Sequence, residues 1–257
     1  MKTIFKVFVA TISSVLMFTQ CEKEPGPNDP VEIPDDEFLR YLILDGVDTN
    51  GDGLISYGEA EKVTKIYLDP DSTGRRNGKV SSVEGIEAFI NLDTLHCCSN
   101  QIQELDVSAN TELRLLVCWN GDENDQLERL NISNNMKLEH ISIPGNLLTD
   151  LDVSNNPSLY KLMCSYNQLT NLDVSNNTNL GQLWCDGNQI ARLDISNNIN
   201  LGKGNEPWIV RINPAVSIRD MPTLAEVCVW TMPFPPTEME IDTTGSPNVY
   251  FTTECSE

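Results

Sequence analysis

Leucine and other apolar residues recur between positions 92 and 201 in a pattern that repeats about every 21 residues. The unit is L-x-x-L-x-C-x-x-N-x-L-x-x-L-D-V-S-x-N-x-x, and successive leading leucines are 21, 25, 21, 21 and 21 residues apart. They are Leu92, Leu113, Leu138, Leu159, Leu180 and Leu201. A fixed period of this length predicts a solenoid, because each unit buries its apolar side only by stacking on its neighbours.

Each unit contains two apolar segments. The first alternates with a period of two and predicts a short strand that directs Leu162 and Cys164 inward. The second returns along the other side and brings Leu172 and Val174 into the core. Stacked units then form a parallel sheet. An asparagine between the segments can satisfy backbone groups inside the stack, and it recurs at Asn100, Asn146, Asn167 and Asn188.

The pattern extends beyond the regular units. Residues 63–68 and 224–229 repeat the spacing of the strand segment, and residues 80–89 supply an apolar run between the first strand and the second. We therefore expect about eight parallel strands, with residues 224–229 as the last. The pattern breaks at a four-residue insertion in 121–126, at Ile143 in place of the cysteine, and in 201–223, where Trp208 and Ile209 are expected to refill the core.

These residues resemble the leucine-rich-repeat family, specifically short bacterial repeats with cysteine in the strand and LDVSxN on the return. Internalin-type repeat proteins are similar in architecture. The resemblance covers residues 63–230 and implies an α/β fold class of mostly β character, a right-handed horseshoe-like superhelix with a parallel sheet. It also implies a helical cap at the N-terminus and a binding function without a particular partner.

Residues 48–59 match the EF-hand loop D-x-[DN]-x-[DN]-G-x5-E at every specified position. The expected calcium ligands are side-chain oxygens of three residues, one backbone carbonyl, one residue acting through water, and one bidentate carboxylate. In that order they are Asp48, Asn50 and Asp52, then Leu54, Ser56 and Glu59. The alternative is an Asp/Asn/Gly-rich turn that binds nothing.

Helices are expected on both sides of this loop. An acidic first turn at Asp35 and Asp36 precedes an apolar run, and residues 59–65 can continue as the exiting helix. No second EF-hand loop is visible, so we expect a structural ion rather than a sensor. In this respect the loop resembles dockerin-like and other extracellular EF-hands.

The N-terminus is typical of an export signal. Lys2 and Lys6 precede a short apolar stretch that ends before Cys21. This arrangement resembles a bacterial lipoprotein signal whose cysteine is acylated, although Gln20 stands where a small residue is usual. The resemblance implies an outer-membrane lipoprotein exposed at the cell surface, and the alternative is plain secretion. The expected divisions are a signal peptide at 1–20, a tether at 21–34, an EF-hand-like cap at 35–65, repeats at 63–230 and a C-terminal cap at 231–257.

Composition narrows the classes of partner. The formal net charge of −21 repels phosphate backbones, so nucleic acid is not expected as a partner. We expect a monomer anchored to the outer membrane through its lipid. No Ser-His-Asp, Cys-His or phosphate-loop pattern is present, so we do not expect an enzyme.

Eight cysteines raise the possibility of a metal or disulfide framework. Four occupy the same inward strand position at spacings unlike those of metal ligands, which favours core packing: Cys97, Cys118, Cys164 and Cys185. Cys98 is expected to point outward as a free thiol. Cys228 and Cys255 can form a disulfide that holds the C-terminal tail, but the sequence leaves this open.

The outward strand positions contain more apolar side chains than solvent exposure favours, together with both histidines of the chain. The residues expected to bind a partner are Leu115, Val117, Trp119, Met163, Trp184, His96 and His140. The C-terminal tail can cover this surface instead, although we favour a tail that closes the end of the solenoid.

The leading hypothesis is a surface lipoprotein that binds a protein or a glycan through the concave sheet face. One alternative is a scaffold subunit of an envelope assembly. A weaker one is an accessory to a carbohydrate-active enzyme, or a glycosidase whose paired carboxylates the sequence does not single out.

Overall fold

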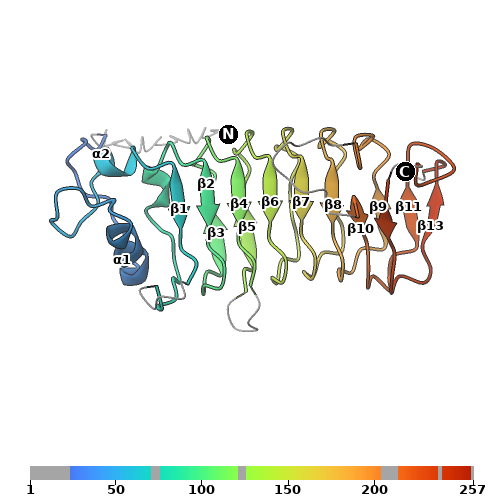
Figure 1. The fold of residues 1–257 in the computed structure, drawn as a ribbon, viewed down its shortest axis with the longest axis horizontal. Coiled ribbons are helices and arrows are strands. Elements are labelled where there is room, and N and C mark those ends of the chain that lie inside the picture. The colour runs from blue at the N-terminus through green and yellow to red at the C-terminus, as the bar shows by residue number, and fades with distance from the viewer. Residues whose placement is uncertain (1–23, 71–75, 121–125, 204–213, 237–238, 256–257) are drawn as a thin grey trace, which may run out of the picture.

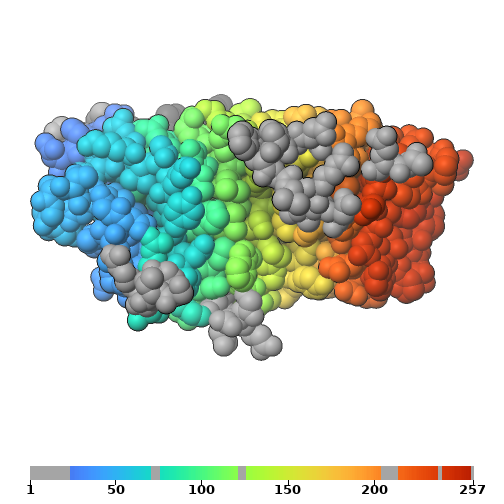
Figure 2. Space-filling model, in the orientation of Figure 1, coloured from blue at the N-terminus to red at the C-terminus, as the bar shows by residue number. Residues whose placement is uncertain are grey.

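The computed structural model describes residues 24–70, 76–120, 126–203, 214–236 and 239–255. The proposed signal peptide, Cys21, Trp208, Ile209 and nearly all of the four-residue insertion lie outside these described residues. The molecule is an elongated stack of coils that begins at a helical end and finishes at a β end (Figure 1). In the space-filling view the coils follow one another along this length in sequence order, from blue to red (Figure 2).

Two helices begin the chain. Helix α1 (Asp36–Leu44) follows Asp35, whose side chain accepts hydrogen bonds from the N–H groups of Glu37 and Phe38. Helix α2 (Tyr57–Ala60) begins with a capping box between Ser56 and Glu59. The acidic first turn of α1 is confirmed. The continuation of a helix through residues 59–65 is wrong, because α2 ends at Ala60.

The reason for this early end is the pairing of the next segment. Strand β1 (Lys65–Tyr67) already belongs to the sheet, and the carbonyl of Thr64 accepts hydrogen bonds from the N–H groups of Asp93 and Thr94. Hydrogen bonds to the second coil therefore fix residues 64–67 as extended chain.

One long parallel sheet, the front sheet, runs the length of the stack. Its strands, in spatial order, are β1, β2 (Thr94–His96), β4 (Leu115–Val117), β6 (His140–Ser142), β7 (Lys161–Met163), β8 (Gln182–Trp184), β10 (Val216–Ser217) and β12 (Ile241–Asp242). From β2 onward their central apolar residues lie in register, as Leu95, Leu116, Ile141, Leu162, Leu183, Val216 and Ile241. The expected long parallel sheet is confirmed and has eight strands, although its last member is not the expected one.

The return side of the coils forms two smaller parallel sheets. One pairs β3 (Glu104–Asp106) with β5 (Arg129–Asn131), and the other has the order β13 (Tyr250–Thr252), β11 (Glu226–Cys228), β9 (Arg192–Asp194). Between them Leu151 and Leu172 keep the same inward position and are 6% and 3% exposed. A 3₁₀ turn, η1 (Ile86–Ala88), lies in the first coil.

The expected last strand of the front sheet is wrong. Residues 224–229 contain β11, which pairs with β9 on the return side, whereas β10 and β12 complete the front sheet. The mistake arises because both halves of a unit share the same apolar spacing. Val227 lies in register with Leu193 of a return segment rather than with a front strand.

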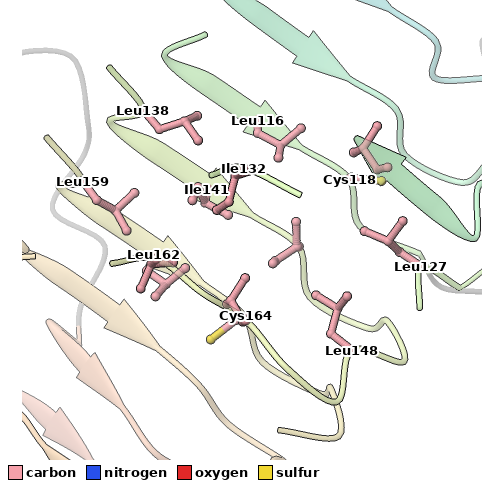
Figure 3. Packing of buried hydrophobic residues seen from close by; sticks show 14 of the residues in the cluster. Leu116, Cys118, Leu127, Ile132, Leu138, Ile141, Leu148, Leu159, Leu162 and Cys164 are labelled. Carbon is pink, nitrogen blue, oxygen red and sulfur yellow. The ribbon is translucent and has the colours of Figure 1, made fainter. Parts of the chain in front are cut away.

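The core lies between the front and return segments. Leucines from both sides meet there, with the cysteines of the strand column among them (Figure 3). The six leading leucines are 0–1% exposed. The four column cysteines are free and 0% exposed, as is Ile143 at the same position. Burial raises the pKa of Cys164 to about 12, so this thiol stays neutral. Core packing of the column is confirmed.

Asparagine amides connect the coils. Asn167 accepts a hydrogen bond from the N–H of Leu148 and donates to the carbonyls of Ile143 and Cys164. This is the predicted column. A second column, which the sequence analysis missed, lies at the turn after the return segment. It consists of Asn110, Asn135, Asn156, Asn177 and Asn198, each 0% exposed.

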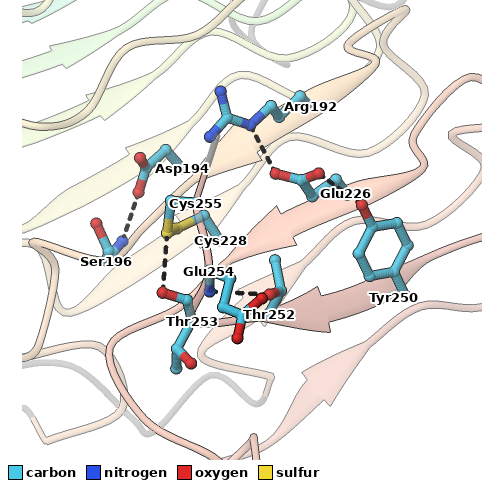
Figure 4. The surroundings of a disulfide bond; sticks show 10 residues. All are labelled: Arg192, Asp194, Ser196, Glu226, Cys228, Tyr250, Thr252, Thr253, Glu254 and Cys255. Atoms are coloured by element: carbon cyan, nitrogen blue, oxygen red, sulfur yellow. Dashed lines mark hydrogen bonds and ion pairs between the residues drawn. A yellow bond between two sulfur atoms is a disulfide. The ribbon is translucent and has the colours of Figure 1, made fainter. Parts of the chain in front are cut away.

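Segments assigned as tether and C-terminal cap contribute to the fold. Pro30 pairs with Ser56 in an antiparallel bridge, and Val31 donates to the carbonyl of Ile55, so the later part of the 21–34 segment is docked rather than a free tether. Within 231–257, β12 and β13 add one further coil. A disulfide joins Cys255 of this segment to Cys228 of β11 (Figure 4).

Candidate binding face and calcium loop

The outward side of the front sheet from β2 to β8 is the candidate binding surface, here called the strand face. Trp119, just after β4, is its most exposed large apolar residue, at 47%. The other predicted partner residues are all half-buried: His96, Leu115, Val117, His140, Met163 and Trp184. The period-two pattern alone placed these side chains outward, and the structure shows them there.

A pocket of about 420 Å³ opens in the middle of the strand face. It is lined by Leu115, Val117, Trp119, His140, Ile141, Ser142, Lys161 and Met163. The pocket thus brings together five of the seven predicted partner residues from three consecutive strands. It also adds Lys161 and Ser142, which the apolar pattern did not select.

The remaining two predicted residues lie outside this pocket and contact other groups. His96 stacks on Tyr67, with ring centroids 5.0 Å apart, and its Nδ1 lies 3.6 Å from Oδ2 of Asp69. The indole N–H of Trp184 donates to the carbonyl of Pro214 at 2.8 Å. The polar edge of Trp184 is therefore engaged within the protein, and its ring forms one border of the surface.

Three of the outward positions that follow the front strands are closed, which the sequence did not indicate: Cys98, Ser165 and Asp186 are 2–6% exposed. Asp186 is 2% exposed and accepts hydrogen bonds from the hydroxyls of Ser165 and Ser217 and from the N–H of Arg219. Cys98, at the equivalent position after β2, is a free thiol, as expected. It is only 3% exposed, so its expected outward presentation is wrong, and burial raises its pKa to about 12.

The described tail does not close the pocket. Phe234 packs against Trp230 and Phe251, with ring centroids 5.3 Å and 5.1 Å away, at the last coil. Trp119 remains exposed. The described residues of the tail therefore lie at the end of the stack, as expected for a tail that closes this end.

The candidate calcium loop is folded by its own side chains. Asp48 accepts hydrogen bonds from the N–H groups of Gly51 and Gly53, at 2.7 and 3.0 Å. Asn50 and Asp52 accept in the same way from residues two positions further on. Gly51 and Gly53 have positive φ angles of 76° and 82°, which are strained for residues that carry a side chain.

Glu59 closes this loop. One carboxylate oxygen accepts from the side chain and N–H of Thr49, and the other from the N–H and side chain of Ser56. These bonds, led by the Thr49 hydroxyl, lower the pKa of Glu59 to about 2. Hard oxygen donors of this kind suit calcium.

The carboxylates of the loop do not converge on one point. Among the described residues, one group of three His, Cys, Asp or Glu side chains places its ligand atoms within 4.8 Å of one another. It consists of Asp194 with the two disulfide cysteines.

The stacked 21-residue units, their buried leucines and one front strand per regular coil decide the architecture. The fold is a leucine-rich-repeat solenoid. No helix formed by the described residues is long and apolar enough to cross a membrane.

No protein-family model matches the sequence, and no curated protein matches it. Similar solved structures include the functional domain of InlJ from Listeria monocytogenes, described as containing a cysteine ladder, at 21% identity and a TM-score of 0.38. That match covers 88% of this chain and 63% of the InlJ domain.

Two further internalins of Listeria monocytogenes are similar. Internalin C2 has 20% identity and a TM-score of 0.32, covering 69% of this chain and 95% of its own. Internalin InlF has 19% identity and a TM-score of 0.27, with 86% and 78% covered.

Proposed function

We propose that this leucine-rich-repeat chain is a non-enzymatic surface protein that binds a protein or glycan partner through its strand face. The supporting observation is Trp119, which is 47% exposed at the border of a pocket of about 420 Å³. Tryptophan and methionine are enriched at interfaces. Because hydrogen bonds between parallel strands hold this surface rigid, binding loses little conformational entropy.

The test is a screen of the chain against arrays of surface proteins and glycans, followed by Trp119→Ala. We expect the variant to weaken binding of any specific ligand by about tenfold or more, because large aromatic side chains dominate interface energies. Met136→Ala is the matched control, since Met136 is 62% exposed and does not line the pocket. Unchanged binding in Trp119→Ala places the site elsewhere and contradicts the proposal.

We propose a structural calcium ion for the loop of residues 48–59. The ligands are the side chains of Asp48, Asn50, Asp52 and Glu59 and the carbonyl of Leu54, with Ser56 acting through a water. The support is the set of oxygen donors and their order in the loop. Ion binding requires Glu59 to turn from Thr49 and Ser56 toward the other ligands. The ion then locks the helical cap.

Asp52→Asn tests the ion without removing the bonds that close the loop. Asp52 is exposed and accepts from the N–H of Leu54, a bond that asparagine can keep. We expect calcium to raise the Tm of the wild-type chain and to raise that of Asp52→Asn much less. Both should unfold at similar temperatures in chelator, and Asp36→Asn is the control. Equal wild-type Tm values with calcium and with chelator contradict the proposal.

We also propose that Cys21 is acylated and anchors the chain to the outer membrane at the cell surface. The support is the order of basic residues, apolar stretch and cysteine in residues 1–21. Mass spectrometry of the mature N-terminus should show a lipid-modified Cys21, and Cys21→Ala should release the chain from the membrane fraction. An unmodified N-terminus at another residue contradicts this anchor.

A further inference from the structure

The strand face differs in charge from the rest of the molecule. The chain contains 38 Asp and Glu residues against 17 Lys and Arg. The nine outward positions of the β4, β6 and β7 coils nevertheless contain no carboxylate. They are Leu115, Val117, Trp119, His140, Ser142, Pro144, Lys161, Met163 and Ser165. A neutral-to-basic patch in so acidic a protein favours an anionic partner at this place.

Lys161 is the charged group of the pocket. Its Nζ lies 5.8 Å from the ring centroid of Trp184, and no carboxylate of the described residues forms an ion pair with it. Two nearby acidic residues are engaged elsewhere: Glu139 pairs with Arg114, and Asp186 accepts hydrogen bonds from two serines. Burial alone lowers the pKa of Lys161. A partly desolvated ammonium group that is not paired with a carboxylate of the described segments is stabilised when an anion binds beside it.

The rest of the pocket is apolar. Leu115, Val117 and Met163 contribute aliphatic walls, and Trp119 contributes an aromatic edge. The polar side chains that line it are His140, Ser142 and Lys161. A sugar has hydroxyls around its ring and needs several polar partners, whereas an aliphatic or aromatic side chain needs walls of this kind. The lining therefore favours a protein segment.

Lys161 and Met163 occupy alternate positions of β7, so their side chains lie on one face about 7 Å apart. A partner segment that places an apolar side chain beside Met163 can reach Lys161 with a carboxylate one or two residues away. We propose that the pocket binds an extended, acidic protein segment in which a large apolar residue lies within two positions of Asp or Glu. The apolar residue fills the pocket and the carboxylate pairs with Lys161. This inference rests on the proposed binding function of the strand face.

The test uses a displayed library of random dodecapeptides selected on the full chain, with Lys161→Met as the counter-selection. Methionine keeps the aliphatic stem of Lys161, and Lys161→Gln is a second variant in case the first packs differently. We expect enriched peptides to share an apolar residue within two positions of Asp or Glu. A synthetic copy should bind the wild-type chain about tenfold more tightly than either variant, and more weakly as salt rises.

Two controls make the ion pair specific. Replacing the peptide carboxylate by its amide should weaken binding to the wild-type chain and cause no further loss in Lys161→Met. Lys137→Gln, which removes an exposed lysine paired with Glu112, should leave the affinity unchanged.

The outcomes separate this inference from the function on which it rests. Peptides that need Trp119 but not Lys161, or that lack an acidic residue, overturn the inference and leave the proposed function standing. A glycan as the sole ligand lost in Trp119→Ala does the same. Ligands insensitive to Trp119→Ala overturn both.

Discussion

Asparagine side chains make the most regular polar contacts between neighbouring coils. Asn167 in one column and Asn177 in the other donate hydrogen bonds from their side-chain amides to backbone carbonyls of their own coil or of the coil before it. These bonds satisfy polar backbone atoms inside the stack. The column at Asn100, Asn146, Asn167 and Asn188 was predictable because the residue recurs at a fixed position. The buried role of Asp186 was not, because it depends on hydroxyls from two other coils.

Asn177→Ala should strongly destabilise the chain. Asn177 is 0% exposed and donates to the carbonyls of Val153 and Asn156, at 2.9 and 3.0 Å. Leaving both acceptors without a donor lowers the free energy of unfolding by about 2–4 kcal/mol. Urea unfolding measures the change. Asn176→Ala removes an exposed neighbouring amide and should change stability by less than about 0.5 kcal/mol. Equal changes in the free energy of unfolding would show that the buried asparagine stabilises the chain no more than the exposed one.

Asp35, at the start of α1, is one of the side chains that connect the helical cap to the repeats. Asp35 accepts from the N–H groups of Glu37 and Phe38 with one oxygen and from Ser81 and Ser82 with the other. Partial burial raises the pKa of Asp35, but the bonds from Ser81, Phe38 and Ser82 outweigh this and hold it below 3.8. The cap and the first coil therefore share a charged contact.

Asp35→Ala should lower the free energy of unfolding at pH 7 by about 1–2 kcal/mol, because the helix loses its N-cap. The pKa of Asp35 is lower in the folded chain than in the unfolded one. Its stabilisation is therefore complete above pH 3.8 and disappears as pH falls through the lower folded value. Urea titrations at pH 7 and pH 2 should show the difference between variant and wild type shrinking in acid. Asp36→Ala is the control, and a difference independent of pH would contradict a charged cap.

At the scale of the element, spacing predicted strands but not the sheets that they join. The apolar spacing of residues 224–229 fits a front strand and a return strand equally well. Hydrogen bonds with β9 and β13 place it on the return side. The prediction of an exiting helix through residues 59–65 is wrong for a related reason, because residues 64–67 pair with the second coil.

The whole molecule is held by stacking, with each end closed differently. Helices and the Pro30–Ser56 bridge lie at the first coil. At the last coils, Glu226 accepts from Arg192 and from the hydroxyl of Tyr250, and a disulfide joins Cys228 to Cys255 (Figure 4). The five free cysteines of the described chain are buried between these ends.

Thiol titration tests this distribution. In Cys21→Ser protein kept without reductant, the folded chain should react negligibly with a thiol reagent, because all five free cysteines are buried. Unfolding in guanidinium should expose five thiols. Fast reaction of the native chain would mean that Cys98 or a column cysteine is accessible. Two further thiols on unfolding would mean that Cys228 and Cys255 are not joined.

The sequence by itself determined the solenoid, the inward leucines and cysteines, the first asparagine column and the outward side chains of the strand face. These follow from local periodicity, since a strand alternates its sides and a repeat must stack. Only the tertiary structure decided which sheet residues 224–229 join, how exposed residues such as Cys98 are, and that no carboxylate in the described part of the chain forms an ion pair with Lys161. Those features depend on neighbours from other coils, which no local pattern contains.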